Sequence, residues 1–167
     1  MKRMAIAQET LKIIDAGYYH SREGKRVDID REVSACVAGT KYYEPDRLLE
    51  IEQKVSSYSA RFDNTEFEVR NETTLMGAER LARSPDLQKI GVLNFASAKN
   101  PGGGFLKGAK AQEESLARSS ALYKSLVKCP QYYDFHRSHK SLLYSNRMIY
   151  SPNCPIFHKD DGTVRFV

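Results

Sequence analysis

The feature that most constrains this 167-residue sequence is a run of three glycines, Gly102–Gly104, between a short apolar segment and a helix-like segment. Each glycine in an ordered chain loses backbone entropy, on the order of 0.5–1 kcal/mol relative to alanine. A retained triplet therefore indicates a use for bare backbone, either in a strained turn or against a ligand that a Cβ atom would keep away. Glycine-rich turns between a buried strand and a helix are typical places for phosphate and ribose groups.

The segments around this loop predict alternating helices and strands. In 65–70, alternation would turn Phe67 and Val69 toward the core, whereas 90–95 is apolar on both faces, as in a parallel sheet covered by helices. The order predicts one α/β domain over residues 1–167 with helices layered on a sheet. Helices are expected at 3–16 (ended by Gly17), 30–38 (capped by Asp30), from Asp46 onward, 74–83 and 112–128, and strands at 25–29, 65–70, 90–95, 147–150 and 163–167.

Two common nucleotide-binding fingerprints do not fit the glycine loop. Gly103 and Gly108 have P-loop spacing, but Ala109 stands where the lysine should follow. The dinucleotide pattern that would start at Gly102 needs a glycine where the chain has Lys107. We therefore exclude a P-loop NTPase and a Rossmann dehydrogenase.

The charge, the hydropathy and the cysteine content exclude further classes of protein. The formal net charge of +5 is too small to indicate DNA binding. The stretch 99–159 is more basic than the rest, which reflects either ordinary surface variation or an anion-binding region. No apolar run approaches the ~18 residues that cross a bilayer, and Glu9 interrupts any signal peptide, so we expect a cytoplasmic protein with no membrane partner. Three cysteines without a CxxC pair, and only His136 and His139 at close spacing, predict neither a disulfide framework nor a metal site.

The residues Gln112, Glu113 and Glu114 follow seven residues after the triplet. One interpretation is structural, because acidic residues in a first helical turn complement the helix dipole. The other is chemical, because two close carboxylates repel and the pKa of at least one rises, which keeps a proton available near neutral pH. A protonated carboxyl beside an acetal oxygen is the general acid that glycosidic cleavage requires.

Together, the triplet, the seven-residue gap and Gln-Glu-Glu resemble the signature of poly(ADP-ribose) glycohydrolases, and the surrounding stretch 94–123 resembles the microbial type. The resemblance implies a macrodomain-like three-layer α/β/α fold with a mixed central sheet. It implies hydrolysis of the ribose–ribose O-glycosidic bonds of poly(ADP-ribose), with release of ADP-ribose and with no cofactor or metal. The implied roles are Glu114 as general acid and base, Glu113 orienting ribose hydroxyls, Gly102, Gly103 and Gly104 beside the ribose and diphosphate, Asn100 as a ribose contact, and Gln112 shaping the loop.

One part of the family pattern has no match in the sequence. The family's second glycine-rich loop over the diphosphate, and its adenine-stacking aromatic residue, are not found, since the only glycine after Gly108 is Gly162. We therefore expect a sheet that is incomplete at the C-terminal end and a cleft that lacks one wall. Two alternatives stay open: a non-catalytic or inactive ADP-ribose-binding module, and an unrelated α/β protein whose motifs are only a turn and a helix start.

Overall fold

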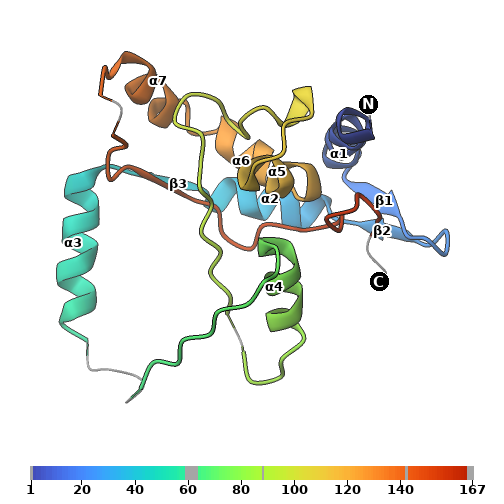
Figure 1. The fold of residues 1–167 in the computed structure, drawn as a ribbon, viewed down its shortest axis with the longest axis horizontal. Helices are drawn as coiled ribbons and strands as arrows, with labels where there is room; N and C mark the ends of the chain where they lie inside the picture. The colour runs from blue at the N-terminus through green and yellow to red at the C-terminus, as the bar shows by residue number, and fades with distance from the viewer. Residues whose placement is uncertain (1, 59–63, 88, 142, 165–167) are drawn as a thin grey trace.

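The computed structural model describes residues 2–58, 64–87, 89–141 and 143–164. Helices and short strands both occur along the described chain, which confirms the mixed α/β character (Figure 1). Their order is α1 (Lys2–Ala16), β1 (Tyr18–His20), β2 (Arg26–Asp28), α2 (Asp30–Gly39), β3 (Lys41–Tyr43), α3 (Pro45–Ser56), α4 (Thr74–Ala82), the 3-10 helix η1 (Phe105–Lys107), α5 (Gln112–Ser119), α6 (Leu122–Val127), α7 (Pro130–Ser138) and β4 (Met148–Tyr150).

Local signals predict most helix ends correctly. Gly17 adopts φ +73° and ends α1, and the side chain of Thr73 caps α4 by accepting the Met76 N–H at 3.1 Å. The helix α3 begins at Pro45, as suits a residue without an N–H in the first turn. The prediction of Asp30 as a cap is wrong, because Ile29 occupies the cap position and Asp30 lies in the first turn of α2.

The strands of the described residues form two antiparallel pairs. Strand β1 pairs with β2, and β3 pairs with β4, with Tyr42 opposite Ile149. The strands predicted at 25–29 and 147–150 are thus confirmed, but the described part of the chain forms no continuous mixed central sheet. Of the strand predicted at 163–167, Val164 forms an isolated bridge with His158, and residues 165–167 lie outside the described residues.

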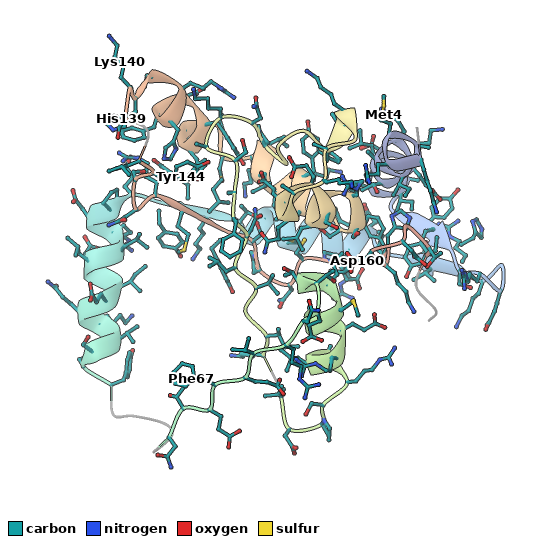
Figure 2. The ribbon with its side chains drawn as sticks, in the orientation of Figure 1. Met4, Phe67, His139, Lys140, Tyr144 and Asp160 are labelled. Atoms are coloured by element: carbon teal, nitrogen blue, oxygen red, sulfur yellow. The ribbon has the colours of Figure 1, made fainter. Side chains whose placement is uncertain are left out.

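Two predicted strands, 65–70 with one face toward the core and 90–95 buried on both faces, have no ladder partner among the described residues. Phe67 and Val69 are 91% and 97% exposed, and Phe95 in the second segment is 72% exposed. Figure 2 shows Phe67 at the outer edge of the molecule, away from the helices of the core. The predictions of a core-facing 65–70 strand and of a buried 90–95 strand are wrong here, because a strand needs a neighbour at its edge and a layer over its face, and the described residues supply neither.

The single helix predicted over 112–128 is broken into α5 and α6. Ser120 lies between them in an extended conformation and forms an isolated β-bridge with Ile156. The N–H of Ala121 donates to the carbonyl of Pro155 at 3.0 Å. A segment distant in sequence therefore takes hydrogen bonds that a continuous helix would use internally, and this correction could not come from local periodicity.

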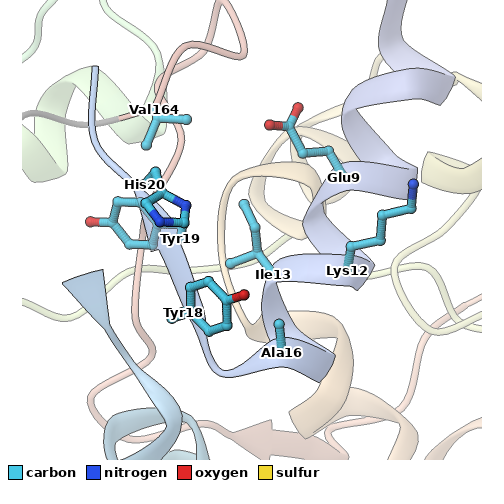
Figure 3. Close-up of a pocket in the computed structure, with 8 residues that line it drawn as sticks. All are labelled: Glu9, Lys12, Ile13, Ala16, Tyr18, Tyr19, His20 and Val164. Atoms are coloured by element: carbon cyan, nitrogen blue, oxygen red, sulfur yellow. The ribbon is translucent and has the colours of Figure 1, made fainter. Parts of the chain in front are cut away.

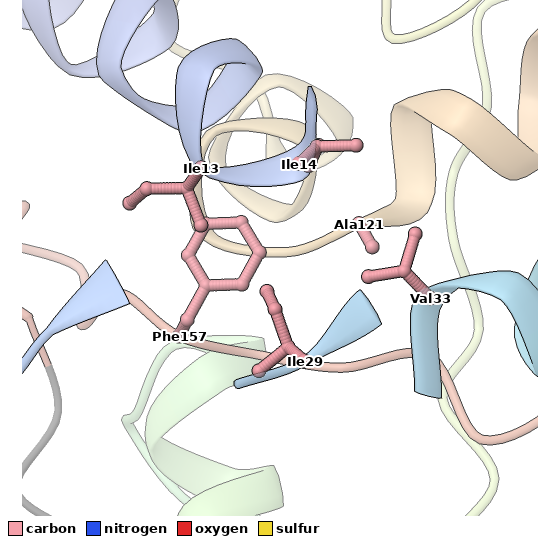
Figure 4. Packing of buried hydrophobic residues seen from close by; sticks show 6 residues of the cluster. All are labelled: Ile13, Ile14, Ile29, Val33, Ala121 and Phe157. Atoms are coloured by element: carbon pink, nitrogen blue, oxygen red, sulfur yellow. The ribbon is translucent and has the colours of Figure 1, made fainter. Parts of the chain in front are cut away.

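The core lies where α1 crosses the segments that carry the glycine loop and α5. In one cluster Phe157 packs between isoleucines of α1 and Ile29 (Figure 4). A second cluster consists of Ala7, Phe105 and Ala117, with Phe105 only 1% exposed. Burial of such an aromatic side chain stabilises by roughly 1.5–3 kcal/mol, so η1 is anchored and the preceding glycines are fixed against α5. Among the helices of the described residues, none is both long and apolar enough to span a membrane.

Candidate active site

The glycine triplet forms a tight turn against the start of α5. Gly102 and Gly103 adopt φ +67° and +57°, a region that residues with a Cβ atom rarely occupy. A Cβ atom on Gly103 would lie 2.8 Å from Cδ of Glu114 and 3.4 Å from Oε2 of Glu113. The triplet is thus a bare-backbone surface against which both carboxylates pack.

Glu114 is held at this surface by the backbone. Its side chain is buried, and Oε1 accepts the Gly104 N–H at 2.9 Å. No described residue donates to or accepts from the other oxygen, Oε2. Because Glu114 lies in the first turn of α5, the helix dipole also favours its negative charge. The structural interpretation of the acidic residues therefore applies to Glu114.

Glu113 is the more deeply buried of the two, at 2% exposure. Its Oε2 accepts the Ser97 N–H at 2.7 Å, and its Oε1 accepts from Nδ2 of Asn94 at 3.3 Å. Burial raises the pKa of Glu113, and the charge of Glu114 raises it further, while hydrogen bonds from Ser97, Asn94 and the Gly102 backbone act in the opposite direction. One carboxyl of the pair does have a raised pKa, but removal from water rather than repulsion is the main cause.

Gln112 does not touch the triplet. Its Oε1 accepts the Phe95 N–H at 2.7 Å, and its Nε2 donates to the Leu93 carbonyl at 2.8 Å and to Oγ1 of Thr74 at 3.0 Å. The amide therefore binds the 93–95 backbone as a neighbouring strand would. Gln112 therefore holds the segment that leads into the glycine loop. The same segment supplies the donors to Glu113.

Asn100 contributes to the turn through its backbone. Its carbonyl accepts the Gly103 N–H at 3.0 Å, its N–H donates to Oγ of Ser97 at 3.2 Å, and its side chain is exposed. The structure thus brings Asn100, the triplet and the acidic pair into one site. Sequence reasoning missed Asn94 and Ser97, and only their position near the end of the apolar segment 90–95 and just after it could have indicated them.

Metal-type ligands do not gather in the described chain, where no group of three or more His, Cys, Asp or Glu side chains could hold an ion. His136 is buried, with Nδ1 2.7 Å from the Tyr132 carbonyl and Nε2 3.0 Å from Oγ of Ser145. A shallow pocket of about 300 Å³ lies between α1 and β1 and includes Ile13 and Tyr19 (Figure 3). It is lined by none of the glycine-loop or acidic residues, and it offers no comparable bare backbone or paired carboxylates.

Comparisons with known proteins agree on one family. Residues 7–159 match the model of the microbial-type PARG catalytic domain. Poly(ADP-ribose) glycohydrolase from Thermomonospora curvata is 45% identical with a TM-score of 0.91, over 98% of this chain and 59% of that chain. Its structure bound to the inhibitor ADP-HPD gives 44% identity and a TM-score of 0.87, over 98% and 57%. The Deinococcus radiodurans enzyme in complex with ADP-ribose is 39% identical with a TM-score of 0.70, over 80% and 52%.

A comparison with curated proteins finds no match. The family match excludes the alternative of an unrelated α/β protein, and the TM-score of 0.91 confirms the macrodomain-like α/β class. The chain spans 59% of the length of the Thermomonospora structure. On this match and this fold, the chain belongs to the family of microbial-type PARG catalytic domains.

Proposed function

We propose that this chain hydrolyses the ribose–ribose O-glycosidic bonds of poly(ADP-ribose) and releases ADP-ribose. The observation that carries the proposal is the contact of Glu114 with Gly104, which holds a carboxylate against a bare-backbone turn. Membership of the family supports the substrate class, since related structures are described with ADP-ribose and with the inhibitor ADP-HPD. No cofactor and no metal enter the proposal.

In the proposed mechanism Glu114 is the general acid and then the general base. Oε1 is occupied by the Gly104 N–H, so Oε2 carries the proton to the leaving ribose oxygen as an oxocarbenium-like centre develops on the other ribose. The ionised Glu114 then accepts a proton from the water that attacks this centre. General acid and base assistance of this kind contributes about 10²–10⁴-fold in rate.

The remaining site residues position the substrate. Glu113, kept in place by Asn94 and Ser97, orients the ribose hydroxyls by accepting hydrogen bonds from them. Gly102–Gly104 lie beside the ribose and diphosphate, where side chains would prevent close approach. Asn100 contacts a ribose, and Gln112 fixes the segment that leads into the loop. This positioning supplies much of the rate enhancement in a reaction of this type.

A non-catalytic ADP-ribose-binding module is the second candidate. It is favoured by one observation: the segment 90–95, which leads into the site, lies without a strand partner among the described residues. A site whose supporting segments are incompletely held binds less precisely and loses rate before it loses affinity, because catalysis depends on close positioning.

Two measurements on the same preparation separate the candidates: release of ADP-ribose from poly(ADP-ribose) by chromatography, and binding of ADP-ribose by calorimetry. We expect release by the wild type, no release by Glu114→Gln, and binding by both. Binding without release in the wild type would favour the second candidate. The absence of both binding and release would contradict the proposed function.

A further inference from the structure

Arg118, on α5, is a buried cation that the proposed mechanism does not use. It is 8% exposed, and a charged side chain at that depth is costly unless it is hydrogen-bonded. Removal from water lowers the pKa of Arg118, and the charge of Arg3 acts in the same direction, whereas the charges of Glu114 and Asp160 oppose it. An arginine stays protonated in spite of such a shift. The chain therefore keeps a full positive charge in the helix that carries Glu114.

The guanidinium of Arg118 donates to the loop that precedes α5. Its Nη1 donates to the Ala109 carbonyl at 2.6 Å. The Ala109 N–H donates in turn to the Gly104 carbonyl at 3.2 Å, and the Gly104 N–H donates to Oε1 of Glu114 at 2.9 Å. Glu114 and Arg118 are four residues apart in α5, which places them on the same face of the helix. These hydrogen bonds form a ring that starts and ends on α5, and we call it the Arg118 ring.

The Arg118 ring closes the turn around η1. Gly108 has φ +80° and precedes Ala109, whose Cβ atom lies so close to Gly104 that a Cβ atom there would be 3.0 Å away. The Gly104 carbonyl also accepts the Lys107 N–H at 2.9 Å, whereas the Ala109 carbonyl is bound from outside the loop, by Arg118. Arg118 therefore ties the far end of this turn to the helix that carries Glu114.

We propose that Arg118 is a positioning residue for the Glu114 carboxylate. It acts through Ala109 and Gly104 and does not touch the substrate. The Gly104 N–H fixes which oxygen of Glu114 faces the loop and which one remains for the leaving ribose oxygen. Release of Ala109 removes one of the two donors to the Gly104 carbonyl, so the direction of the Gly104 N–H is less well fixed. The effect on rate rests on the proposed function, whereas the Arg118 ring does not.

A purely structural role of Arg118 makes a different prediction. The aliphatic stem of an arginine packs as an apolar side chain does, so its loss would only reduce the folded fraction. The rate per folded molecule would then stay the same. A positioning role lowers kcat in folded protein and leaves KM almost unchanged, because misplacement of the acid slows the chemical step more than it weakens binding.

The experiment is a double-mutant cycle on the full chain, with folding checked by circular dichroism. Arg118→Met keeps an unbranched stem and removes the donor, while Ala109→Pro removes the N–H that reaches Gly104 and leaves Arg118 in place. We expect each variant to lose kcat for ADP-ribose release by about tenfold or more, with KM within about twofold. The double variant should lose little more than the larger single loss, because both changes open the same ring. Arg26→Met, at an exposed arginine paired with Asp28, is the control and should keep the wild-type kcat.

Hydrogen exchange separates the Arg118 ring from the reaction. The Gly104 amide should exchange about tenfold or more faster in both single variants than in the wild type, with little change in β1 and β2. If the wild type releases no ADP-ribose, the proposed function fails and exchange at Gly104 alone decides on the ring. If Arg118→Met does not fold, Ala109→Pro decides by the same two measurements. Unchanged exchange at Gly104 in folded variants, an unchanged kcat, or single losses that multiply in the double variant would each overturn the proposal.

Discussion

Gly104 donates its backbone N–H to Oε1 of Glu114 at 2.9 Å. This bond joins the glycine loop to the helix that carries the proposed acid, and it leaves Oε2 without a partner among the described residues. The neighbouring Gly103 has no room for a Cβ atom beside the same carboxylate. The loop can therefore lie this close to Glu114 only because it carries no side chain at that position. The chemistry of the site therefore depends on backbone conformation as much as on the carboxylates.

The first prediction concerns Gly103→Ala. Both the positive φ and the collision with Glu114 oppose the new methyl group, so we expect loss of ADP-ribose release and displacement of the carboxylate. Gly24→Ala is the matched control, since Gly24 also has a positive φ, +79°, but a Cβ atom there meets nothing within 4 Å. Each variant should lose roughly 1–2 kcal/mol of stability from the backbone alone, and only Gly103→Ala should lose activity. Equal activity of the two variants would contradict the packing described here.

The second prediction concerns the pH dependence of stability. Burial raises the pKa of Glu113 in the folded chain, so the folded state holds this proton more tightly than the unfolded state. The stability contributed by the group is complete below its unfolded pKa and is lost as the pH rises through the folded pKa. Glu113→Gln lacks this loss. We therefore expect the free energy of unfolding of the wild type, relative to Glu113→Gln, to fall between acidic and neutral pH in urea titrations.

The structure also indicates how the glutamine is accommodated. Oδ1 of Asn94 is a buried acceptor without a partner in the described chain, so a rotated Asn94 amide can accept from the new Nε2. Glu113→Gln should remain folded with a native circular dichroism spectrum. A stability difference that is independent of pH would show that Glu113 does not titrate with a raised pKa.

The third prediction concerns the Gln112 clamp. Gln112→Ala removes the partners of the Leu93 carbonyl and the Phe95 N–H, so the 93–97 segment should loosen, with a loss of about 1–3 kcal/mol in stability. Hydrogen exchange at Phe95 should accelerate. Thr74→Val removes only the third bond of the same amide and should leave exchange at Phe95 slow. If both variants behave alike, the backbone contacts of Gln112 are not what holds the segment.

The sequence could predict what depends on neighbours along the chain. The bare-backbone turn at Gly103 and the start of α5 at Gln112 follow from glycine content and from local spacing, and the structure has both. The break at Ser120 could not be foreseen, because it depends on Ile156, which is distant in sequence. The prediction that Phe67 faces the core is wrong for the opposite reason. The alternation around Phe67 is that of a strand, but no described element pairs with this segment or covers it.

The site residues also differ in whether the sequence could predict them. Glu113 and Glu114 could be found because side chains of that type at a helix start carry a chemical signal. The Ser97 donor could not, since the group that binds Glu113 is a backbone N–H, which every residue except proline has. Family resemblance supplied the roles, and the structure supplied the contacts that make those roles testable.

The last prediction compares one substitution at two phenylalanines. Phe105 is 1% exposed, packs on Ala7 and Ala117, and lies 4.9 Å between ring centroids from Tyr123, whereas Phe67 is 91% exposed. Phe105→Ala leaves a cavity and should lower the free energy of unfolding by about 3–5 kcal/mol, while Phe67→Ala should change it by about 0.5 kcal/mol or less. Because η1 directly follows the triplet, Phe105→Ala should also weaken ADP-ribose binding under conditions where the chain is still folded. Urea denaturation and calorimetry measure both effects. A large loss of stability in Phe67→Ala would mean that this side chain is covered in solution.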